Sequence, residues 1–213
     1  HSVTYTPFDK VQTVTMGNDN LIIEYGYDRQ RIRMTEIVNG NQRVKTYVGN
    51  CEFIQPSTGD NYSFTYLCSP DGIFAVAEST SSGFRLHYVH TDNLGSWDII
   101  TDMGGDLEQS LSFDAWGNRR NASTWNGSAT DTHLFDRGFT GHEHLYNFGL
   151  INMNGRVYDP FMSTFLSPDN YIQAPDNSQN FNRYAYCLNN PLKYTDPSGE
   201  DFIVAAIIIG GAI

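Results

Sequence analysis

Basic residues are scarce in this sequence. Its 213 residues include 13 Lys and Arg against 24 Asp and Glu, which gives a formal net charge of −11. Binding to a phosphate backbone needs a surplus of cations that displace counterions, so the balance argues against a nucleic-acid partner. Charged residues of both signs make up only 17% of the chain, too few for a self-repelling disordered acidic chain. We therefore expect a folded protein with no nucleic-acid partner.

Cysteine and cofactor motifs are equally sparse. The three cysteines, Cys51, Cys68 and Cys187, have neither a C-x-x-C spacing nor another metal-ligand spacing. We expect buried free thiols, and a Cys51–Cys68 disulfide is the alternative if the chain is exported. No phosphate loop, dinucleotide fingerprint or Ser-centred elbow is present, so the sequence predicts no cofactor.

One pair of histidines has a spacing that a metal ion can use. His142-Glu-His144 would place two imidazoles on one face of a strand. No Cys or Asp stands at a supporting spacing, so at most three ligands are available. We predict no metal site, and we expect the two rings to line a surface or a pocket.

A hydrophobic run is present only at the C-terminal end. Residues 202–213 are apolar, but twelve residues are too few to span a bilayer. We expect this segment to pack inside a larger structure; the alternative is the truncated start of a membrane-inserting or toxin-leading segment. Membrane contact is expected only through these residues. The chain starts at His1 without Met or a signal segment, so we also expect a section of a longer polypeptide.

Aromatic and turn-forming residues are abundant. Phe, Tyr and Trp make up 14% of the chain, and 19 residues are Gly. Such a composition is typical of many short strands joined by tight turns. We predict an all-β fold with a sizeable core, and the composition argues against a helical bundle. Segments with β-branched and aromatic residues at alternate positions predict strands at 11–15, 21–27, 42–48, 62–67, 73–78, 84–90, 97–101 and 107–113.

Turn signals separate these segments. Asn39-Gly40 predicts a hairpin because both residues tolerate a positive φ. A D-x-x-G pattern recurs at 92–95, 102–105 and 114–117; the Asp side chain accepts a downstream backbone N–H, and the Gly closes the turn. Repeated strand-turn units of this kind stack into a growing sheet. Residues 121–136 are expected to form a loop or linker.

Short motifs follow one another in the last third of the chain. They are F-T-G at 139–141, R-x-Y-D-P at 156–160, F-x-S-x-D at 165–169, N-x-Y-x-Y-x-x-N-x-P at 182–191 and D-P-x-G at 196–199. In this order they resemble the core-associated end of the rearrangement-hotspot (Rhs) or YD-repeat family, and the D-x-x-G turns are similar to its repeat units. The resemblance covers about residues 85–200, whereas residues 1–80 match the family only in their general strand-turn pattern.

The resemblance implies a repeated strand-turn sheet that spirals into a hollow shell around a variable C-terminal polypeptide, often a toxin. It implies a bacterial protein that is secreted or associated with the cell surface. Expected partners are its own C-terminal toxin or cargo segment, components of a secretion apparatus, and an immunity protein. We expect YD/Rhs repeat strands over 1–120, a loop over 121–136, an RHS-repeat-associated core over 137–200 and the start of an apolar C-terminal segment over 201–213.

The resemblance also implies a site. In many members of the family a pair of aspartates cuts the chain just after D-P-x-G. Carried over motif by motif, the pair is Asp169 and Asp196, and the bond is Glu200–Asp201. Two adjacent carboxyls cannot both ionise, so one would act as the acid while the other activates water. Any enzyme activity is then at most an intramolecular aspartyl autoprotease.

This sequence departs from the family pattern at two places. Glu200 stands where self-cleaving members usually carry Leu, and two extra acids beside the pair, Glu200 and Asp201, would raise its pKa values. Residues 163–164 are Ser-Thr where the family often has Gly-Arg, so a cation that orients a carboxylate is missing there. The competing interpretation is that Asp159, Asp169 and Asp196 cap turns, because each adjoins a proline.

Two further functions stay open. An adhesion module that recognises carbohydrate or a cell surface would carry its aromatic side chains on an outward platform, whereas a shell would turn them inward. A free-standing hydrolase is not supported, because no other catalytic constellation is present. The side chains that discriminate between shell and adhesin are Tyr25, Tyr47, Tyr88, Trp97 and Trp116.

Overall fold

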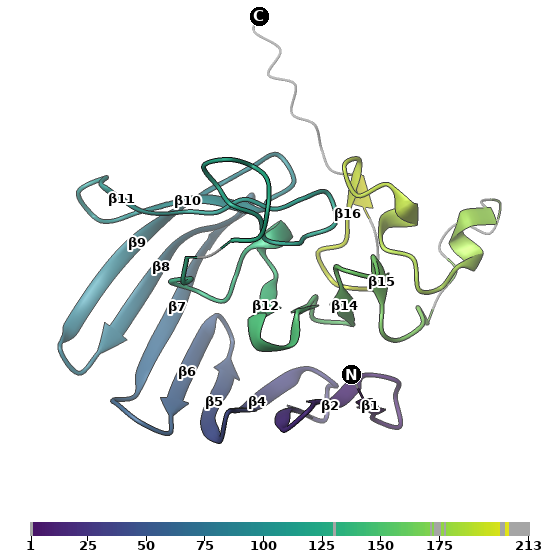
Figure 1. Ribbon diagram of the computed structural model, residues 1–213, viewed down its shortest axis with the longest axis horizontal. Coiled ribbons are helices and arrows are strands. Elements are labelled where there is room, and N and C mark those ends of the chain that lie inside the picture. Colours follow the sequence, from purple (N-terminus) through teal and green to yellow (C-terminus); the bar gives the residue numbers. More distant parts are fainter. Residues whose placement is uncertain are drawn as a thin grey trace, which may run out of the picture.

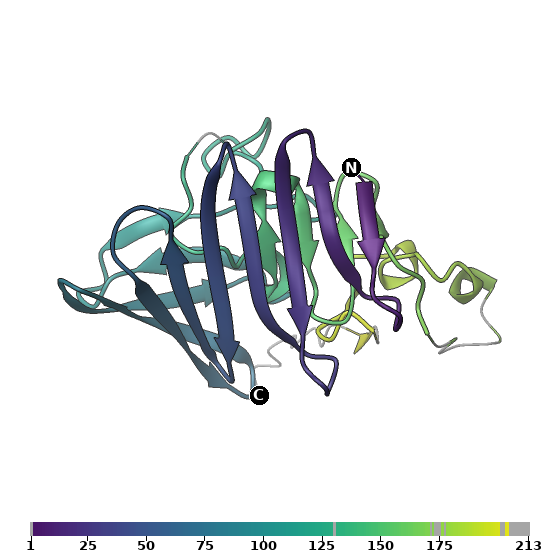
Figure 2. The same cartoon turned by 90° about the horizontal axis from the view of Figure 1, so that it is seen from below.

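A computed structural model describes residues 2–129, 131–170, 172, 176, 178–200 and the backbone of 203–204. Its main element is an antiparallel sheet of eleven strands that pair in the order of the sequence. The sheet is curved, and the strands β12 to β15 lie on its concave side (Figures 1 and 2). The described residues of 111–200 are called the inner segment below. The all-β prediction is confirmed. The strands are β1 (Ser2–Tyr5), β2 (Val11–Met16), β3 (Asp19–Tyr25), β4 (Arg31–Val38), β5 (Asn41–Val48), β6 (Cys51–Pro56), β7 (Tyr62–Ser69), β8 (Gly72–Thr80), β9 (Gly83–Thr91), β10 (Trp97–Thr101) and β11 (Leu107–Ser110).

The turns between these strands form as their residues predict. Asn39 and Gly40 have φ values of 51° and 79° and join β4 to β5. In the first D-x-x-G turn, the amides of Leu94 and Ser96 each donate to Oδ1 of Asp92 at 2.8 Å. The carboxylates of Asp102 and Asp114 accept the equivalent pairs of amides. The first two of these turns join β9 to β10 and β10 to β11, and the third follows β11.

The inner segment folds into short elements that form two small sheets. Strands β12 to β15 pair in order as a four-stranded sheet, and β16 pairs with β17. Among the described residues, no helix has the length and apolarity needed to cross a membrane. The elements are η1 (Phe139–Gly141), β12 (Glu143–Leu145), η2 (Tyr146–Phe148), β13 (Leu150–Asn152), β14 (Val157–Asp159), β15 (Thr164–Phe165), η3 (Ser178–Phe181), η4 (Cys187–Asn189), β16 (Tyr194–Thr195) and β17 (Ile203–Val204).

Apolar contacts fasten the inner segment to both halves of the sheet. One cluster joins Leu21 and Ile23 of β3 to Leu145 and Phe148 of the inner segment. Another joins Trp97, at the start of β10, and other residues of β6 to β10 to the inner segment. A third cluster lies within the inner segment itself. Burial of apolar area at about 25 cal/mol per Å² makes these contacts the main favourable contribution to docking.

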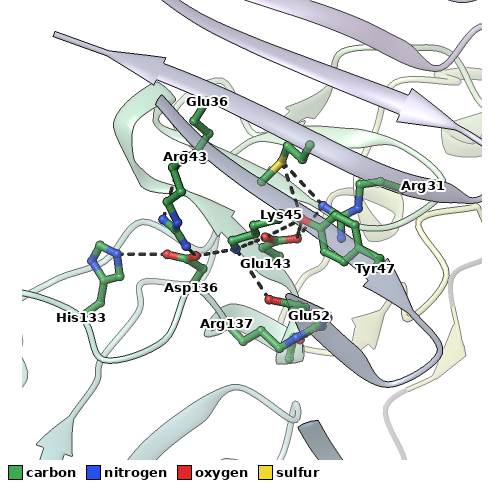
Figure 3. Close-up of polar contacts among 12 residues, drawn as sticks. Arg31, Glu36, Arg43, Lys45, Tyr47, Glu52, His133, Asp136, Arg137 and Glu143 are labelled. Atoms are coloured by element: carbon green, nitrogen blue, oxygen red, sulfur yellow. Dashed lines mark hydrogen bonds and ion pairs between the residues drawn. The ribbon is translucent and has the colours of Figure 1, made fainter. Parts of the chain in front are cut away.

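Charged side chains fill the inner face of the middle strands (Figure 3). Lys45 of β5 is only 1% exposed. Its Nζ lies 2.5 Å from Oδ2 of Asp136, contacts Oε1 of Glu143, and lies 3.7 Å from Oε2 of Glu52 on β6. Asp136 and Glu143 belong to the inner segment, so this single ammonium group ties that segment to the sheet.

Three arginines complete the network. Arg31 Nη1 lies 2.5 Å from Oε2 of Glu143, Arg137 Nη2 lies 3.1 Å from Oε1 of Glu52, and Arg43 pairs with Asp136. Burial alone would raise the pKa of Glu143, but Arg31, Lys45 and Arg137 together lower it to about 2. Four cations face four carboxylates, so the buried charge is balanced: Arg31, Arg43, Lys45 and Arg137 against Glu36, Glu52, Asp136 and Glu143.

Candidate functional site

Asp169 and Asp196 are distant in the sequence, and the structure brings them to one guanidinium group. The Oδ2 atoms of Asp169 and Asp196 lie 3.3 Å and 3.2 Å from Nη2 of Arg156. The two oxygens are therefore at most 6.5 Å apart, the sum of these distances. All three residues are buried. The structure thus brings the two aspartates of these motifs close together. Arg156 of the R-x-Y-D-P motif is their shared partner, and the sequence analysis did not identify it.

The neighbouring strands set the position of each group. Arg156 immediately precedes β14, and Asp196 immediately follows β16. Asp169 follows β15 and is tied to Arg183: the Asp169 amide donates to the Arg183 carbonyl at 2.8 Å, and Arg183 Nε donates to the Asp169 carbonyl at 2.5 Å. The pair is therefore held by the backbone of three separate segments.

Among the aspartates that the sequence offers as turn caps, Asp159 is only a turn cap, whereas Asp196 has a second role. Oδ1 of Asp159 accepts the amides of Phe161 and Met162 at 2.9 and 3.0 Å, which is a turn cap and lies outside the pair. Asp196 starts a turn in which the Gly199 amide donates to its carbonyl at 3.4 Å, while its Oδ2 faces Arg156. Asp196 therefore shapes the D-P-x-G turn and also belongs to the paired site.

The D-P-x-G segment is held by all four of its carbonyl groups. His142 Nε2 donates to the Asp196 carbonyl at 2.9 Å, and Asn154 Nδ2 donates to that of Pro197 at 3.4 Å. The Gly155 amide donates to the Ser198 carbonyl at 2.8 Å, and Arg156 Nε donates to that of Gly199 at 2.5 Å. We call these four donors the carbonyl clamp. Three of them are successive residues, 154–156, in the turn between β13 and β14.

Two glycines make this close approach possible. Gly199 has a φ of 71°, and a Cβ built there would overlap the carbonyl of Met153. A Cβ on Gly155 would lie 2.9 Å from the carbonyl oxygens of both Ser198 and Gly199. A side chain at either position would push the two backbones apart, so the Gly of D-P-x-G is required by the clamp as well as by the turn.

The cause of the raised pKa of Asp196 differs from the extra acids that the sequence suggests. Burial raises the pKa of Asp196, against the opposing effect of Arg156. The cation that is missing at residues 163–164 is thus supplied from Arg156. Oε1 of Glu200 lies 3.9 Å from Nζ of Lys10, so a cation in the connection between β1 and β2 compensates for part of its charge. Asp201, the other residue of the expected cleavage bond, lies outside the described residues.

A small cavity adjoins the two carboxylates. It measures about 10 Å³ and is bounded by Arg156, Asp169 and Asp196 among others, which gives room for about one water molecule. Cys187 and Leu188 also line it and have φ values of 50° and 51°. Left-handed backbone in such residues is strained, by roughly 1–3 kcal/mol each, and persists where the surrounding structure enforces it.

The other candidate groups have structural roles. His142 donates to Asp196, and Nε2 of His144 accepts the Phe139 amide at 3.0 Å. Burial lowers the pKa of His142 to about 4 and that of His144 to about 3, so both rings are neutral near pH 7. The expected surface or pocket position is wrong for these two rings, which are buried.

The cysteines are free, but only one is buried. Burial raises the pKa of the Cys187 thiol to about 12, which makes it a poor nucleophile. Cys51 is partly buried and Cys68 is exposed, in contrast to the buried thiols that the sequence analysis expects. Cys51 lies opposite Thr65, and Cys68 lies opposite Ile73, so the two cysteines do not face each other across the sheet.

Comparison by sequence finds similar segments in much longer proteins. No family model matches the chain. The tRNA3(Ser)-specific nuclease WapA of Bacillus spizizenii is 29% identical over 203 residues, which are 92% of this chain and 8% of that protein. The tRNA nuclease WapA of Bacillus subtilis is 28% identical over 202 residues, with the same coverage. Salivary gland surface protein 1 of Aedes aegypti is 24% identical over 229 residues, 99% of this chain and 6% of that protein.

Comparison of folds finds solved toxin structures. The crystal structure of TcdB2-TccC3-Cdc42 matches with a TM-score of 0.74 at 19% identity, over 92% of this chain and 10% of that chain. The Photorhabdus luminescens Tc holotoxin pore matches with a TM-score of 0.70, over 93% of this chain and 10% of that chain. The chain shares the fold of these Rhs-type shells. Together with the WapA similarity, this supports the Rhs-related family that the motifs imply, without singling out its core region.

Proposed function

We propose that this chain is the C-terminal part of an Rhs-type, toxin-associated β-shell that encloses the polypeptide following Gly199. The observation that carries the proposal is the carbonyl clamp on the concave side of the sheet, which holds residues 196–199 against the inner segment. The curved sheet adds strands strictly in sequence order, which suits a wall that grows by repetition. The direct test is whether the polypeptide after Gly199 lies inside or outside the sheet in the full-length protein.

The direction of the aromatic side chains favours a shell over an adhesin. Tyr25 and Tyr47 pack against the first apolar cluster, Trp97 is 1% exposed in the second, and Trp116 packs against the third. Tyr88 is the exception at 39% exposed. An outward aromatic platform for carbohydrate would reverse this distribution, so the adhesion module is the weaker candidate.

The names of the similar proteins suggest the cargo. Two are tRNA nucleases and others are Tc toxin assemblies, so the enclosed polypeptide is proposed to be a toxin. The proposed location is secreted or surface-associated, in keeping with the Tc toxins and the salivary gland surface protein. An immunity protein and a secretion apparatus are the corresponding proposed partners.

Self-cleavage at the paired aspartates is the finer part of the proposal. Burial raises the pKa of Asp196, so we assign the role of the acid to Asp196 and the role of the base to Asp169. Asp169 takes a proton from one water molecule, and the water oxygen bonds to the carbonyl carbon of Glu200. Asp196 gives its proton to the nitrogen of Asp201 as the peptide bond breaks. The products are a carboxyl group on Glu200 and an amine on Asp201, so the reaction consumes one water and no other reactant.

Asparagine variants test the assignment of the pair. Asp169→Asn and Asp196→Asn each remove one carboxyl group at nearly constant volume, so each is expected to leave the full-length chain intact. The rate should fall by about a hundredfold or more, as for other lost acid–base groups. Asp159→Asn is the matched control, because that carboxylate caps a turn outside the pair. Intact mass measures the outcome, and equal cleavage in all three variants would contradict the assignment.

A further inference from the structure

The side chain of Glu200, the residue just before the expected cleavage bond, is held between two parts of the fold. A Cβ built on Gly155 would overlap Cγ of Glu200, so the bare glycine in the turn between β13 and β14 makes room for that side chain. At its other end, Oε1 of Glu200 lies 3.9 Å from Nζ of Lys10. The Glu200 amide donates to Oγ of Ser198 at 3.1 Å. The backbone and the side chain of residue 200 therefore both have defined partners.

Lys10 is a partly enclosed cation rather than a free surface lysine. Its amide donates to Oγ1 of Thr6 at 3.1 Å, and its carbonyl accepts the Thr6 amide at 2.8 Å. The Lys10 side chain is 11% exposed, and its Nζ lies 5.8 Å from the centroid of the Tyr25 ring. Burial lowers the pKa of Lys10, and Glu200 is the strongest of the groups that oppose this lowering. An enclosed ammonium group gains more from a carboxylate than an exposed one does.

The connection that carries Lys10 is fixed relative to the inner segment. At its start, the hydroxyl group of Tyr5 donates to the Leu166 carbonyl at 2.8 Å. At its end, Val11 is buried in the first apolar cluster, and its carbonyl accepts a hydrogen bond from the hydroxyl group of Tyr25 at 2.7 Å. The position of Lys10 opposite residue 200 is therefore set by the docking of the inner segment against the sheet.

We propose that Lys10 is a specificity-determining residue: its ammonium group forms a subsite that selects an acidic side chain at position 200, just before the bond to be cut. The inference rests on the proposed self-cleavage and deepens it. A held side chain at position 200 also restrains the carbonyl of that residue, which is the carbonyl that the water attacks. Complementary charges select a partner mainly by rejecting a like charge. Lys10 touches no reacting atom, so it acts through the position of Glu200.

Charge reversal on both sides tests the subsite in the full-length protein. Lys10→Glu and Glu200→Lys each place two like charges at this contact, so each alone is expected to slow cleavage by about tenfold or more. The double variant restores an opposite pair and is expected to be cut within about threefold of the wild-type rate. Arg33→Glu is the matched control with an unchanged rate, because it reverses a cation that lies 4.0 Å from Glu24. A double variant cut no faster than the single reversals would overturn the inference while self-cleavage stands.

A second readout does not depend on cleavage. In the Asp196→Asn background, which is expected to stay intact, the protection of the residue-200 amide from hydrogen exchange reports how firmly Glu200 is held. Adding Lys10→Glu is expected to lower that protection by about fivefold or more, and adding Glu200→Lys as well is expected to restore it. If the wild-type protein is never cut, self-cleavage fails, and this loss and recovery still support recognition of the side chain by Lys10. Unchanged protection in the Lys10→Glu variant would overturn it.

A milder variant covers the case in which a carboxylate at position 10 disturbs folding. Lys10→Met keeps an apolar stem of similar length and removes only the charge. With Lys10 present, the wild-type chain is expected to be cut about threefold or more faster than Glu200→Leu, in line with an ion pair worth up to about 1 kcal/mol. With Lys10→Met, this preference for Glu over Leu is expected to disappear. The same preference in both backgrounds, with all four proteins folded by circular dichroism, would contradict the subsite.

Discussion

Replacing Lys45 with Met is expected to destabilise the protein by about 3–5 kcal/mol. The Lys45 side chain is only 2% exposed, and its ammonium group contacts Asp136, Glu143 and Glu52. Its removal leaves three buried carboxylates without their shared cation, and breaking a buried pair by removing one partner carries this cost. The measurement is the free energy of unfolding from a urea titration. Because Lys45 joins the sheet to the inner segment, the same variant is expected to expose residues 136–143 to hydrogen exchange.

Two companion variants separate the charge effect from packing. Arg33→Met on the neighbouring strand β4 removes an exposed ion pair with Glu24 at 4.0 Å, which is expected to cost less than about 1 kcal/mol. Adding Glu143→Gln to Lys45→Met removes one of the carboxylates that have lost Lys45 as a partner. This is expected to recover part of the lost free energy of unfolding. A Lys45→Met protein as stable as Arg33→Met would show that the network does not fasten the inner segment.

Acidification from about pH 7 to about pH 5 is expected to lower the free energy of unfolding by about 3–4 kcal/mol. Burial lowers the pKa of His142 to about 4 and of His144 to about 3, whereas both titrate near 6.5 when unfolded. Between these values the unfolded chain binds protons that the folded chain does not, so stability falls as the pH falls. Glu143, with its pKa lowered to about 2, adds a second loss below about pH 4.5.

The histidine contribution has a specific control. His142→Gln keeps an N–H donor for the Asp196 carbonyl but does not titrate, so it is expected to remove about half of the loss between pH 7 and pH 5. His90→Gln is the control, because His90 is exposed on β9. Urea titrations at both pH values measure the difference. An identical pH dependence in the two variants would contradict the assignment to His142.

The all-β fold could be predicted from the sequence because most strands have a plain alternation and most turns carry Asn, Asp or Gly. Strands β4 and β6 could not be predicted from alternation, because their inward positions include Glu36 and Glu52. On β5 the apolar residues Val44 and Val48 suggest the buried face, yet the network uses the alternate positions, Lys45 and Tyr47. The partners of these charges are about 90 residues away, and alternation within one strand carries no information about them.

The candidate site shows the same division between local and distant information. Asp169, Asp196 and Glu200 could be named from the sequence, because the family resemblance assigns roles to positions within the motifs. Arg156 belongs to the R-x-Y-D-P motif, but its role could not be predicted. Its contacts with three segments depend on how β14, β15 and β16 pack. The clamp likewise depends on a close approach of Gly155 to the D-P-x-G turn, which spacing alone does not reveal.

The most direct test of the shell is an electron cryomicroscopy map of the full-length protein. We expect the curved sheet to continue from the β1 edge into a closed wall, with residues 196–199 in the clamp and the following polypeptide enclosed by that wall. Enclosure is expected in the wild-type protein and also in Asp196→Asn, because the clamp acts on the uncut chain. Density for the following polypeptide outside the wall, or a sheet that stays open to solvent on its concave side, would contradict the proposed function.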